Sequence, residues 1–273
     1  MSFVGEGVAV VTGAGSGIGR GLALRLAEMG SAVALADVDE AGLMETASSL
    51  GAKRAAVTTH VVDVADEGAV QAFAADVVAR HGRVTLLINN AGVALFGTFE
   101  ELSVEDLRWL IGVNFWGVVY GMRYFLPMLK RERRGHIVNL SSVFGIVAPV
   151  GHSAYAASKF AVRGISEAVR HELAGTNVGL SVVHPAGVRT SIARKARLGA
   201  GAPVVKREEG IVELDRVAKS SAAEAADRIL RGVERGEPRI LIGGDAWKID
   251  WMQRLMPGTY WKLMMRAYGL REK

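Results

Sequence analysis

The 273-residue chain contains no cysteine. That absence excludes disulfides, thiolate catalysis and cysteine-based metal sites, and it fits a reducing compartment. Proline is scarce, with six residues, and no long apolar run is free of polar interruptions. The most membrane-like stretch, residues 109–129, contains Asn114 and Arg123, so a buried helix suits it better than a membrane span.

The chain carries a modest excess of basic over acidic residues, 33 against 28. The formal net charge is +5, yet no basic stripe is interleaved with aromatic residues, so nucleic acid is not an expected partner. No metal-ligand cluster stands out either, and we expect no metal. The first strand begins within about ten residues of Met1, which leaves no room for a signal peptide and favours the cytoplasm. Half of the residues are apolar, which is ample for one α/β domain and tight for two.

Residues 7–37 carry the strongest motif, in the order strand, glycine loop, helix, strand. Val8–Thr12 is a β-branched run typical of a buried parallel strand, and the glycine loop Thr12–Gly19 follows it with the sequence TGAGSGIG. Glycines let the backbone turn tightly, and the start of the next helix offers unpaired N–H groups to a diphosphate. Asp37 ends the second strand about 20 residues past the loop, where a carboxylate accepts hydrogen bonds from an adenosine ribose.

The remainder of the chain alternates between apolar strands and amphipathic helices. We expect strands at 54–62, 84–88, 135–140, 178–183 and 239–242, and helices at 40–50, 66–80, 103–129, 155–173 and 221–233. This alternation predicts an α/β fold with a parallel sheet, whose ligands lie beyond the carboxyl ends of the strands. Polar residues fall at several such ends, where each is also compatible with an ordinary turn: Asp63, Asn89–Gly92 and Ser141–Ser142.

Two helices carry polar residues that point to chemistry. Asn114 is a poor helix-interior residue, and its buried amide must be satisfied either by neighbouring backbone or by a functional water or carbonyl. Tyr155 and Lys159 are four residues apart and share a helix face. An ammonium beside a phenol lowers the pKa of the phenol from about 10 towards the range of a general acid–base. A surface pair is the alternative interpretation of that spacing.

Taken together, these motifs resemble the short-chain dehydrogenase/reductase family. The resemblance implies a Rossmann-type, doubly wound sheet of seven parallel strands in the order 3-2-1-4-5-6-7, within a single domain. It also implies a nicotinamide cofactor and hydride transfer between a hydroxyl carbon and a carbonyl. The matching segments follow the family's order and spacing across residues 5–245: Thr12–Gly19, Asp63–Val64, Asn89–Gly92, Asn114, Ser141–Ser142, Tyr155 with Lys159, and Pro185–Thr190.

The resemblance also implies roles for individual residues. Ser142 would hydrogen-bond the substrate oxygen, and Tyr155 would exchange the proton of the hydroxyl group. Lys159 would depress the pKa of Tyr155 and hold the nicotinamide ribose, and Asn114 would support Lys159 through a water. The residues that would bind the cofactor are Gly13, Ser16, Gly17, Ile18, Gly19, Asp37, Asp63, Val64, Asn90, Ala91, Gly92, Tyr155, Lys159, Pro185, Gly187, Val188 and Thr190.

Asp37 selects between the two nicotinamide cofactors. A carboxylate there accepts hydrogen bonds from both ribose hydroxyls of NAD and repels the 2′-phosphate of NADP. No arginine follows Asp37, and Ser16 is neutral where phosphate-binding relatives often place a basic residue. We therefore expect NAD rather than NADP.

The segment after the sixth predicted strand departs from the family pattern. Ala186 stands where family members usually carry glycine after Pro185, and we expect a small local change in the turn without loss of binding. Residues 190–214 lack clean periodicity, and in the family this region covers the substrate. A solvated loop is the alternative interpretation of its charges, which are Arg194, Lys195, Arg197, Lys206 and Arg207.

Residues 246–273 form an extension past the family core. Its tryptophans, methionines and basic residues suit two short amphipathic helices broken at Pro257–Gly258. Three roles stay open: packing on the chain's own core or a neighbouring subunit, a lid over an apolar substrate, and contact with an anionic membrane surface. The first of these is our prediction.

The sequence therefore predicts an NAD(H)-dependent oxidoreductase that interconverts a secondary alcohol and a ketone on an apolar substrate. Its catalytic domain would span residues 1–245. We expect a cytoplasmic homodimer or homotetramer, paired through the helices at 109–129 and 155–173. The alternative is a non-catalytic dinucleotide-sensing module, although such proteins tend to lose the tyrosine or lysine that this chain keeps.

Overall fold

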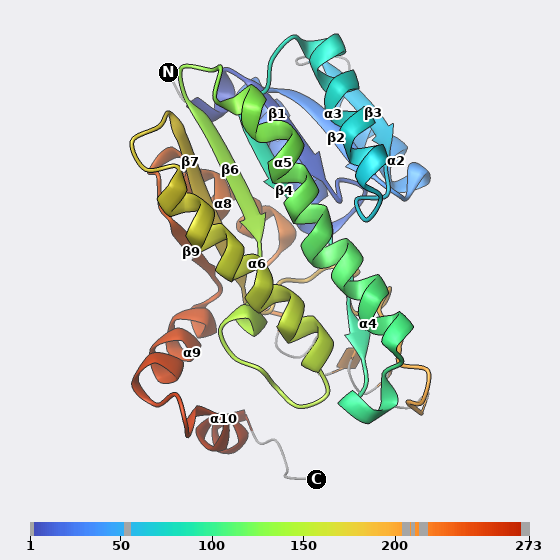
Figure 1. Cartoon of the computed structure of the whole chain (residues 1–273), viewed down its shortest axis with the longest axis vertical. Helices are drawn as coiled ribbons and strands as arrows, with labels where there is room; N and C mark the ends of the chain where they lie inside the picture. The colour runs from blue at the N-terminus through green and yellow to red at the C-terminus, as the bar shows by residue number, and fades with distance from the viewer. Residues whose placement is uncertain (1–2, 52–55, 204–207, 209–210, 213–217, 269–273) are drawn as a thin grey trace.

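A seven-stranded parallel sheet forms the centre of the protein (Figure 1). The computed structural model describes residues 3–51, 56–203, 208, 211–212 and 218–268. The strand order β3-β2-β1-β4-β6-β7-β9 confirms the predicted order, because these strands are the third, second, first, fourth, fifth, sixth and seventh of the sheet along the chain. Their bounds are β1 Val8–Thr12, β2 Ala32–Asp37, β3 Val57–Val61, β4 Leu86–Asn89, β6 Gly135–Leu140, β7 Val178–Pro185 and β9 Arg239–Ile242.

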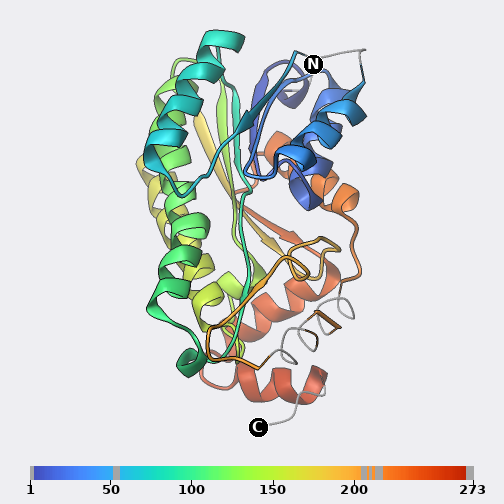
Figure 2. The ribbon, with the colours of Figure 1, turned by 90° about the vertical axis from the view of Figure 1, so that its right-hand side faces the viewer.

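Helices cover both faces of the sheet (Figure 2). Helices α1, α2 and α8 pack on one face, and α3, α5 and α6 pack on the other. Alternate residues of β1 enter the two cores, since Ala9 and Val11 belong to the first and Val10 to the second. The helix bounds are α1 Gly17–Met29, α2 Glu40–Leu50, α3 Glu67–His81, α4 Val104–Ile111, α5 Gly117–Leu129, α6 Ser153–Glu172 and α8 Ala222–Glu234.

The helix predicted at 103–129 is interrupted. Ser103 caps its start in a capping box with Asp106, and α4 then ends at Ile111. A π-helical turn, η3 (Gly112–Trp116), separates α4 from α5. Such turns insert an extra residue into the helix and are frequent at functional sites.

A second, two-stranded sheet was not predicted. It pairs β5 (Leu95–Phe96) with β8 (Arg197–Leu198) in parallel. These segments are too short to show strand periodicity, and their pairing depends on a contact across about a hundred residues. The predicted strand at 54–62 is shorter than expected, and its residues 54–55 lie outside the described residues.

Helix α5 approaches the sheet closely at Gly121. A methyl group on that residue would overlap the carboxamide oxygen of Asn89. Asn89 is buried, and its Nδ2 donates to Oδ1 of Asn139 at 2.8 Å, so the side chain has little freedom to move aside. The contact explains why a glycine occupies this helical position, where glycine is otherwise unfavourable.

We expect Gly121→Ala to lower the free energy of unfolding by about 1–3 kcal/mol, because the methyl overpacks the interface of α5 with β4. Urea denaturation measures the change. The control is Gly164→Ala on α6, where the methyl meets open space and should be neutral or stabilise by up to about 1 kcal/mol. Equal stability of Gly121→Ala and the natural chain would contradict the close approach.

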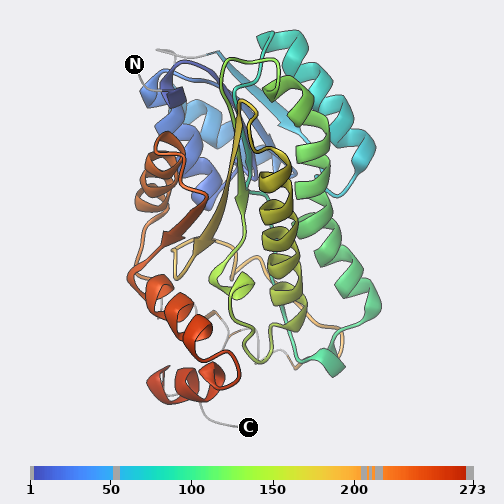
Figure 3. The same ribbon diagram turned by 60° about the vertical axis from the view of Figure 1, so that its left-hand side comes forward.

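Two helices follow β9 at the end of the molecule away from the N-terminus (Figure 3). They are α9 (Gly244–Leu255) and α10 (Tyr260–Tyr268), and the break between them falls at the predicted Pro257–Gly258. Ile249 and Met264 pack against Val143 in one apolar cluster. The two helices therefore pack on the core of their own chain. Within the described part of the chain, no helix combines the length and apolar character needed to cross a bilayer.

Candidate active site

A cavity of about 1240 Å³ opens at the carboxyl ends of the sheet strands. Ligands of open parallel sheets bind at this edge. The segments after β1, β2, β4, β6 and β7 contribute to its wall, as do α9 and α10. Most residues that the sequence nominates line it: Gly13, Ser16, Gly17, Ile18, Asp37, Asp63, Val64, Asn90, Ala91, Gly92, Ser142, Tyr155, Lys159, Pro185, Gly187, Val188 and Thr190.

Gly19 and Asn114 are the nominated residues that do not line the cavity. Gly19 is buried in the first turn of α1, where a methyl group would overlap the carbonyl oxygen of Gly13. Its missing side chain lets the helix pack directly behind the glycine loop. Gly19 thus shapes the loop and does not face the cavity.

The glycine loop has the backbone geometry of an anion-binding turn. Gly13 and Gly17 have φ angles of +67° and +53°, in the left-handed region that favours glycine. Ser16 is the N-cap of α1, but its side chain makes no capping hydrogen bond, whereas Asp39 and Asp66 cap α2 and α3. The first N–H groups of α1 therefore lack the side-chain acceptor that the other two helices have. A diphosphate fits such a helix start.

Asp37 is held in place by two backbone amides at the end of β2. Its Oδ2 accepts from Gly15 N at 2.8 Å, and its Oδ1 accepts from Asp39 N at 3.0 Å. Each carboxylate oxygen retains further acceptor capacity towards the cavity. Asp63 serves a turn, since its Oδ1 accepts from Ala65 N at 2.9 Å, and it lines the cavity as well.

Asn90 ties the end of β4 to the glycine loop. Its Nδ2 donates to the carbonyl oxygens of Thr12 at 2.8 Å and Gly13 at 3.1 Å, and its backbone N donates to Thr12 Oγ1 at 3.0 Å. The side-chain donors of Asn90 are thus committed to the loop. Contact with a ribose, which the resemblance implies, stays a prediction.

The two serines after β6 have different surroundings. Ser141 is buried, and its hydroxyl donates to the carbonyl oxygen of Lys159 at 2.8 Å, which fixes β6 to α6. Ser142 lines the cavity, and its Oγ accepts from Phe144 N at 3.1 Å. Ser141 also lines the cavity, but its hydroxyl proton is committed to Lys159, so the Ser142 hydroxyl is the one left to donate to a ligand, as the resemblance implies.

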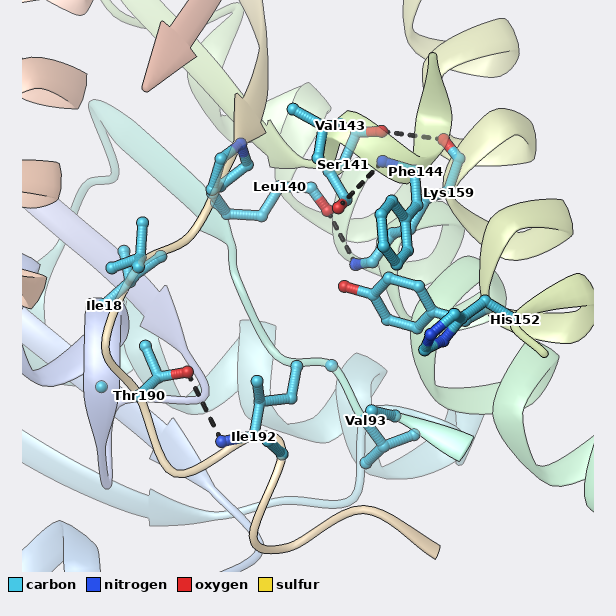
Figure 4. Close-up of a pocket in the computed structure, with 18 of the residues that line it drawn as sticks. Ile18, Val93, Leu140, Ser141, Val143, Phe144, His152, Lys159, Thr190 and Ile192 are labelled. Atoms are coloured by element: carbon cyan, nitrogen blue, oxygen red, sulfur yellow. Dashed lines mark hydrogen bonds between the residues drawn. The ribbon is translucent and has the colours of Figure 1, made fainter. Parts of the chain in front are cut away.

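Tyr155 and Lys159 project from the first turns of α6 into the same part of the cavity as Ser142. The Lys159 Nζ atom lies 5.7 Å from the centroid of the Tyr155 ring and donates to the carbonyl oxygen of Leu140 at 3.0 Å. The Ser142 hydroxyl lies close enough to the Tyr155 phenol to favour its ionised form. Figure 4 shows Lys159 with Phe144 and His152 on one side of the cavity and Ile18, Thr190 and Ile192 on the other.

Burial dominates the ionisation of this pair. It raises the pKa of Tyr155 to about 12, while the neighbouring Ser142 hydroxyl acts in the opposite direction. It also lowers the pKa of Lys159 to about 8. The prediction that Lys159 lowers the pKa of Tyr155 is therefore wrong in this structure. Desolvation disfavours the charged form of both groups, and the ammonium donates to a backbone carbonyl instead of the phenol.

Asn114 lies in the π-helical turn and is satisfied by neighbouring groups. Its Oδ1 accepts from Val93 N at 2.8 Å, and its Nδ2 donates to Val93 O at 3.0 Å and Ser158 Oγ at 3.1 Å. This is the first of the two alternatives that the sequence left open. A methyl group on Gly92 would lie 3.3 Å from Asn114 Oδ1 and 3.4 Å from Lys159 Nζ, so both groups border that glycine. Support of Lys159 through a water stays a prediction.

The segment after β7 accommodates Ala186 without strain. Gly187 supplies the left-handed turn with φ +56°, and among the described residues only glycines have positive φ. Thr190 approaches the glycine loop, because a methyl group on Gly17 would lie 3.1 Å from its Cγ2 atom. The loop after β7 and the loop after β1 thus meet at the cavity.

The described basic residues of this segment, Arg194, Lys195 and Arg197, are exposed. Lys195 Nζ lies 2.9 Å from Asp39 Oδ2, and the Arg197 guanidinium lies 3.6 Å from the ring centroid of Trp109. Both side chains are exposed, as the solvated-loop alternative expects, and each also contacts one neighbouring side chain. Lys206 and Arg207 lie outside the described residues.

Sequence reasoning missed the apolar part of the cavity. His152 packs its ring 5.0 Å from that of Phe144 and 5.7 Å from that of Phe96, and burial lowers its pKa to about 4. The apolar pattern of the tail could have indicated that α10 lines the cavity. The approach of the other apolar lining residues to Tyr155 depends on the tertiary fold. The missed lining residues include Phe96, Trp109, Phe144, Val150, His152, Ile192, Ile249, Trp261, Met264 and Met265.

Comparisons with known proteins agree with this geometry. A family model described as short chain dehydrogenase matches residues 7–200. The chain is 43% identical over 267 residues to SadH of Mycobacterium tuberculosis, across 96% of this chain and 95% of SadH. It is 36% identical over 200 residues to the D-threitol dehydrogenase of Mycolicibacterium smegmatis, across 73% of this chain and 77% of that protein.

A solved structure of a short-chain dehydrogenase/reductase has a similar fold. It is the crystal structure of a short chain dehydrogenase/reductase from Burkholderia phymatum in complex with NAD. Its TM-score is 0.87 at 35% sequence identity, and the match covers 93% of this chain and 95% of that chain. No group of three or more His, Cys, Asp or Glu side chains suited to a metal ion occurs among the residues described here. The chain is an oxidoreductase of the short-chain dehydrogenase/reductase family.

Proposed function

We propose that the protein is an NAD(H)-dependent oxidoreductase that interconverts a secondary alcohol and a ketone, with Tyr155 as general acid–base. One observation carries the proposal: Ser142, Tyr155 and Lys159 line the same cavity as the glycine loop and Asp37. Removal of hydride from an alcohol carbon requires a dinucleotide site and a proton acceptor within reach of one substrate. The relative named D-threitol dehydrogenase supports the alcohol class.

The polar residues of the cavity have separate roles in the reaction. The Ser142 hydroxyl hydrogen-bonds the substrate oxygen and holds it against the Tyr155 phenol. Tyr155 takes the hydroxyl proton during oxidation and returns it during reduction. Lys159 is charged below pH 8, and its ammonium would hold the nicotinamide ribose. Asn114 holds the backbone of Val93 beside this group.

The other end of the cavity fits a nicotinamide dinucleotide. The uncapped start of α1 and the glycine loop would hold its diphosphate, and Asp37 would hold the adenosine ribose. Asp63 and Val64 would border the adenine, and Val188 and Thr190 the nicotinamide end. When bound, this cofactor supplies the hydride acceptor for the alcohol or the hydride donor for the ketone.

The wall beyond Tyr155 favours an apolar substrate. It consists of aromatic and aliphatic side chains from segments far apart in the chain, among them Trp109, Phe144, Trp261 and Met264. His152 borders this wall, and its low pKa keeps the ring neutral at physiological pH. A neutral ring can hydrogen-bond a substrate without requiring it to be charged.

The test of the proposed function has two steps. Titration with NAD, followed by tryptophan fluorescence, measures cofactor binding. A panel of secondary alcohols, including steroids, terpenols and medium-chain compounds, is then followed at the absorbance of the reduced nicotinamide. Turnover of at least one class supports the proposal. Tight NAD binding with no turnover across the panel would favour the dinucleotide-sensing alternative.

We expect Asp37→Asn to reduce the preference for NAD over NADP, expressed as a ratio of kcat/KM values, by about tenfold or more. The amide oxygen keeps the acceptor for Gly15 N and gives up the one for Asp39 N, and the substitution removes the charge that repels a 2′-phosphate. Steady-state kinetics with both cofactors give the ratio. Asp227→Asn, which removes a similar charge on α8, is the control. Faster turnover of the natural enzyme with NADP at equal concentration would contradict the assignment.

We further propose that the enzyme is a cytoplasmic homodimer or homotetramer. The outer side of η3 and α6 exposes two aromatic rings, Trp116 and Phe160, on the helices that the resemblance implicates in pairing. Light scattering after size-exclusion chromatography measures the oligomeric mass. A monomer at micromolar concentration would contradict pairing.

A further inference from the structure

Helix α9 presents an apolar stripe to solvent. Trp247, Trp251 and Leu255 are spaced four residues apart, which places them on one helix face, and they are 56%, 56% and 70% exposed. Met256 continues the stripe at the end of the helix and is 47% exposed. We call these four residues the α9 outer face. They are four of the thirteen large apolar residues that the described part of the chain exposes, gathered within ten positions.

Basic side chains border the α9 outer face on both sides. Lys248 and Arg254 lie three residues before and after Trp251, which places them about 60° to either side of it around the helix. Their side chains are 80% and 52% exposed. The stripe therefore has one cation on each side.

Acidic groups contribute little to the same surface. Asp250 is buried and bound by Arg239 and Arg254, and Asp245 lies near Lys219 and Lys248. Helix α10 adds two cations, Lys262 and Arg266, at the same end of the molecule (Figure 1). Helices α9 and α10 together therefore carry a net positive charge.

The opposite side of the same two helices forms part of the cavity wall. Ile249 lies about 160° from Trp251 around α9 and lines the cavity, as do Trp261 and Met264 of α10. These residues also pack on Val143, so α9 is anchored to the fold and its outer stripe is not needed for that anchoring. The helix pair therefore separates the cavity from the basic, apolar surface.

We propose that the α9 outer face docks the enzyme onto an anionic lipid bilayer. Tryptophan rings partition to the level of the lipid headgroups, and lysine and arginine beside them attract anionic lipids. A contact between two copies of this chain would place two positively charged surfaces against each other, and the centres of protein interfaces are depleted in lysine. The composition and its charge thus favour a lipid surface over a second copy. This proposal does not depend on the proposed redox reaction.

Vesicle co-sedimentation of the full chain tests the docking. The vesicles are phosphatidylcholine alone and phosphatidylcholine with about one-third phosphatidylglycerol, and we expect at least about tenfold stronger partitioning into the anionic ones. Trp247→Ser/Trp251→Ser should reduce that partitioning by about tenfold because it removes both rings from the interface. Lys248→Glu should weaken binding to the anionic vesicles only, and raising the salt concentration should do the same.

Controls distinguish a lipid contact from misfolding and from a contact between copies. Phe99→Ser removes an exposed aromatic ring elsewhere on the surface and should leave partitioning unchanged. Circular dichroism and thermal melting check that each variant is folded. Sedimentation does not depend on turnover, so its failure is distinct from failure of the redox proposal.

Two results would overturn the docking: equal partitioning of the natural chain into both kinds of vesicle, and unchanged binding of the double variant. A loss of oligomeric mass in the double variant, without vesicle binding by the natural chain, would also overturn it and would assign the α9 outer face to a contact between copies.

Discussion

Tyr155→Phe is expected to lower kcat by a factor of about 10²–10⁴ while NAD binding stays unchanged, because a general acid–base contributes an effect of this size. The substitution removes one oxygen atom and leaves a ring of the same shape. The ring also packs against Phe144 at a centroid distance of 6.0 Å, and that contact survives. A loss confined to turnover would therefore identify the phenolic oxygen as the group that exchanges the substrate proton.

The pH dependence distinguishes this role from a structural one. Burial raises the pKa of Tyr155 to about 12, so the phenolate fraction of the free enzyme increases with pH across the neutral and mildly alkaline range. The kcat/KM for alcohol oxidation, which needs the phenolate, should rise with pH accordingly. The residual rate of Tyr155→Phe should lack this rise.

A matched control for this variant is Tyr124→Phe. The Tyr124 hydroxyl donates to Glu67 at 2.8 Å on the surface, far from the chemistry proposed here. Kinetics and a fluorescence titration with NAD are measured on both variants. Full activity in Tyr155→Phe would exclude the proposed mechanism, and loss of NAD binding would assign the tyrosine to cofactor binding alone.

Lys159→Met is expected to remove activity and at the same time stabilise the fold. Lys159 is 3% exposed, and among the described residues no carboxylate forms an ion pair with it. A buried charge without a partner destabilises the native state, and methionine fills a similar volume without a charge. We expect the free energy of unfolding near pH 7 to rise by about 1–2 kcal/mol, after allowing for the lost hydrogen bond to Leu140.

The sign of the pH effect follows from the pKa of Lys159. Burial lowers it from 10.5 to about 8, so the native state holds the proton less tightly than the unfolded chain does. The destabilisation is complete below pH 8 and disappears as the pH rises from 8 towards 10.5. The stability gain of Lys159→Met should therefore shrink over that interval.

Urea denaturation at pH 7 and near pH 10 tests this expectation. Lys130→Met, at the exposed C-cap of α5, controls for the loss of a surface charge and should change neither stability nor turnover. A less stable Lys159→Met at pH 7 would mean that the ammonium contributes net stability through its hydrogen bond to Leu140. Retained activity would remove Lys159 from the mechanism.

Prediction from the sequence succeeded where the determining interactions are local. The period of the α-helix places Tyr155 and Lys159 on one face, and the alternation of strands and helices determines the parallel sheet. The sequence did not predict the π-helical turn around Asn114, because no sequence periodicity indicates such a turn. It also failed at the β5–β8 pair, because two-residue strands carry no readable pattern.

Motifs and spacings along the chain were enough to establish the family, the strand order and most of the residues that reach the cavity. The shifts in the pKa values of Tyr155 and Lys159 could be found only in the folded molecule. They arise from desolvation, which depends on how closely segments that are far apart in sequence pack around each group. The same holds for the hydrogen bonds of Asn114 with Val93 and for Trp261 and Met264 in the cavity wall. Contacts of that kind depend on how the whole chain packs, and no local pattern encodes them.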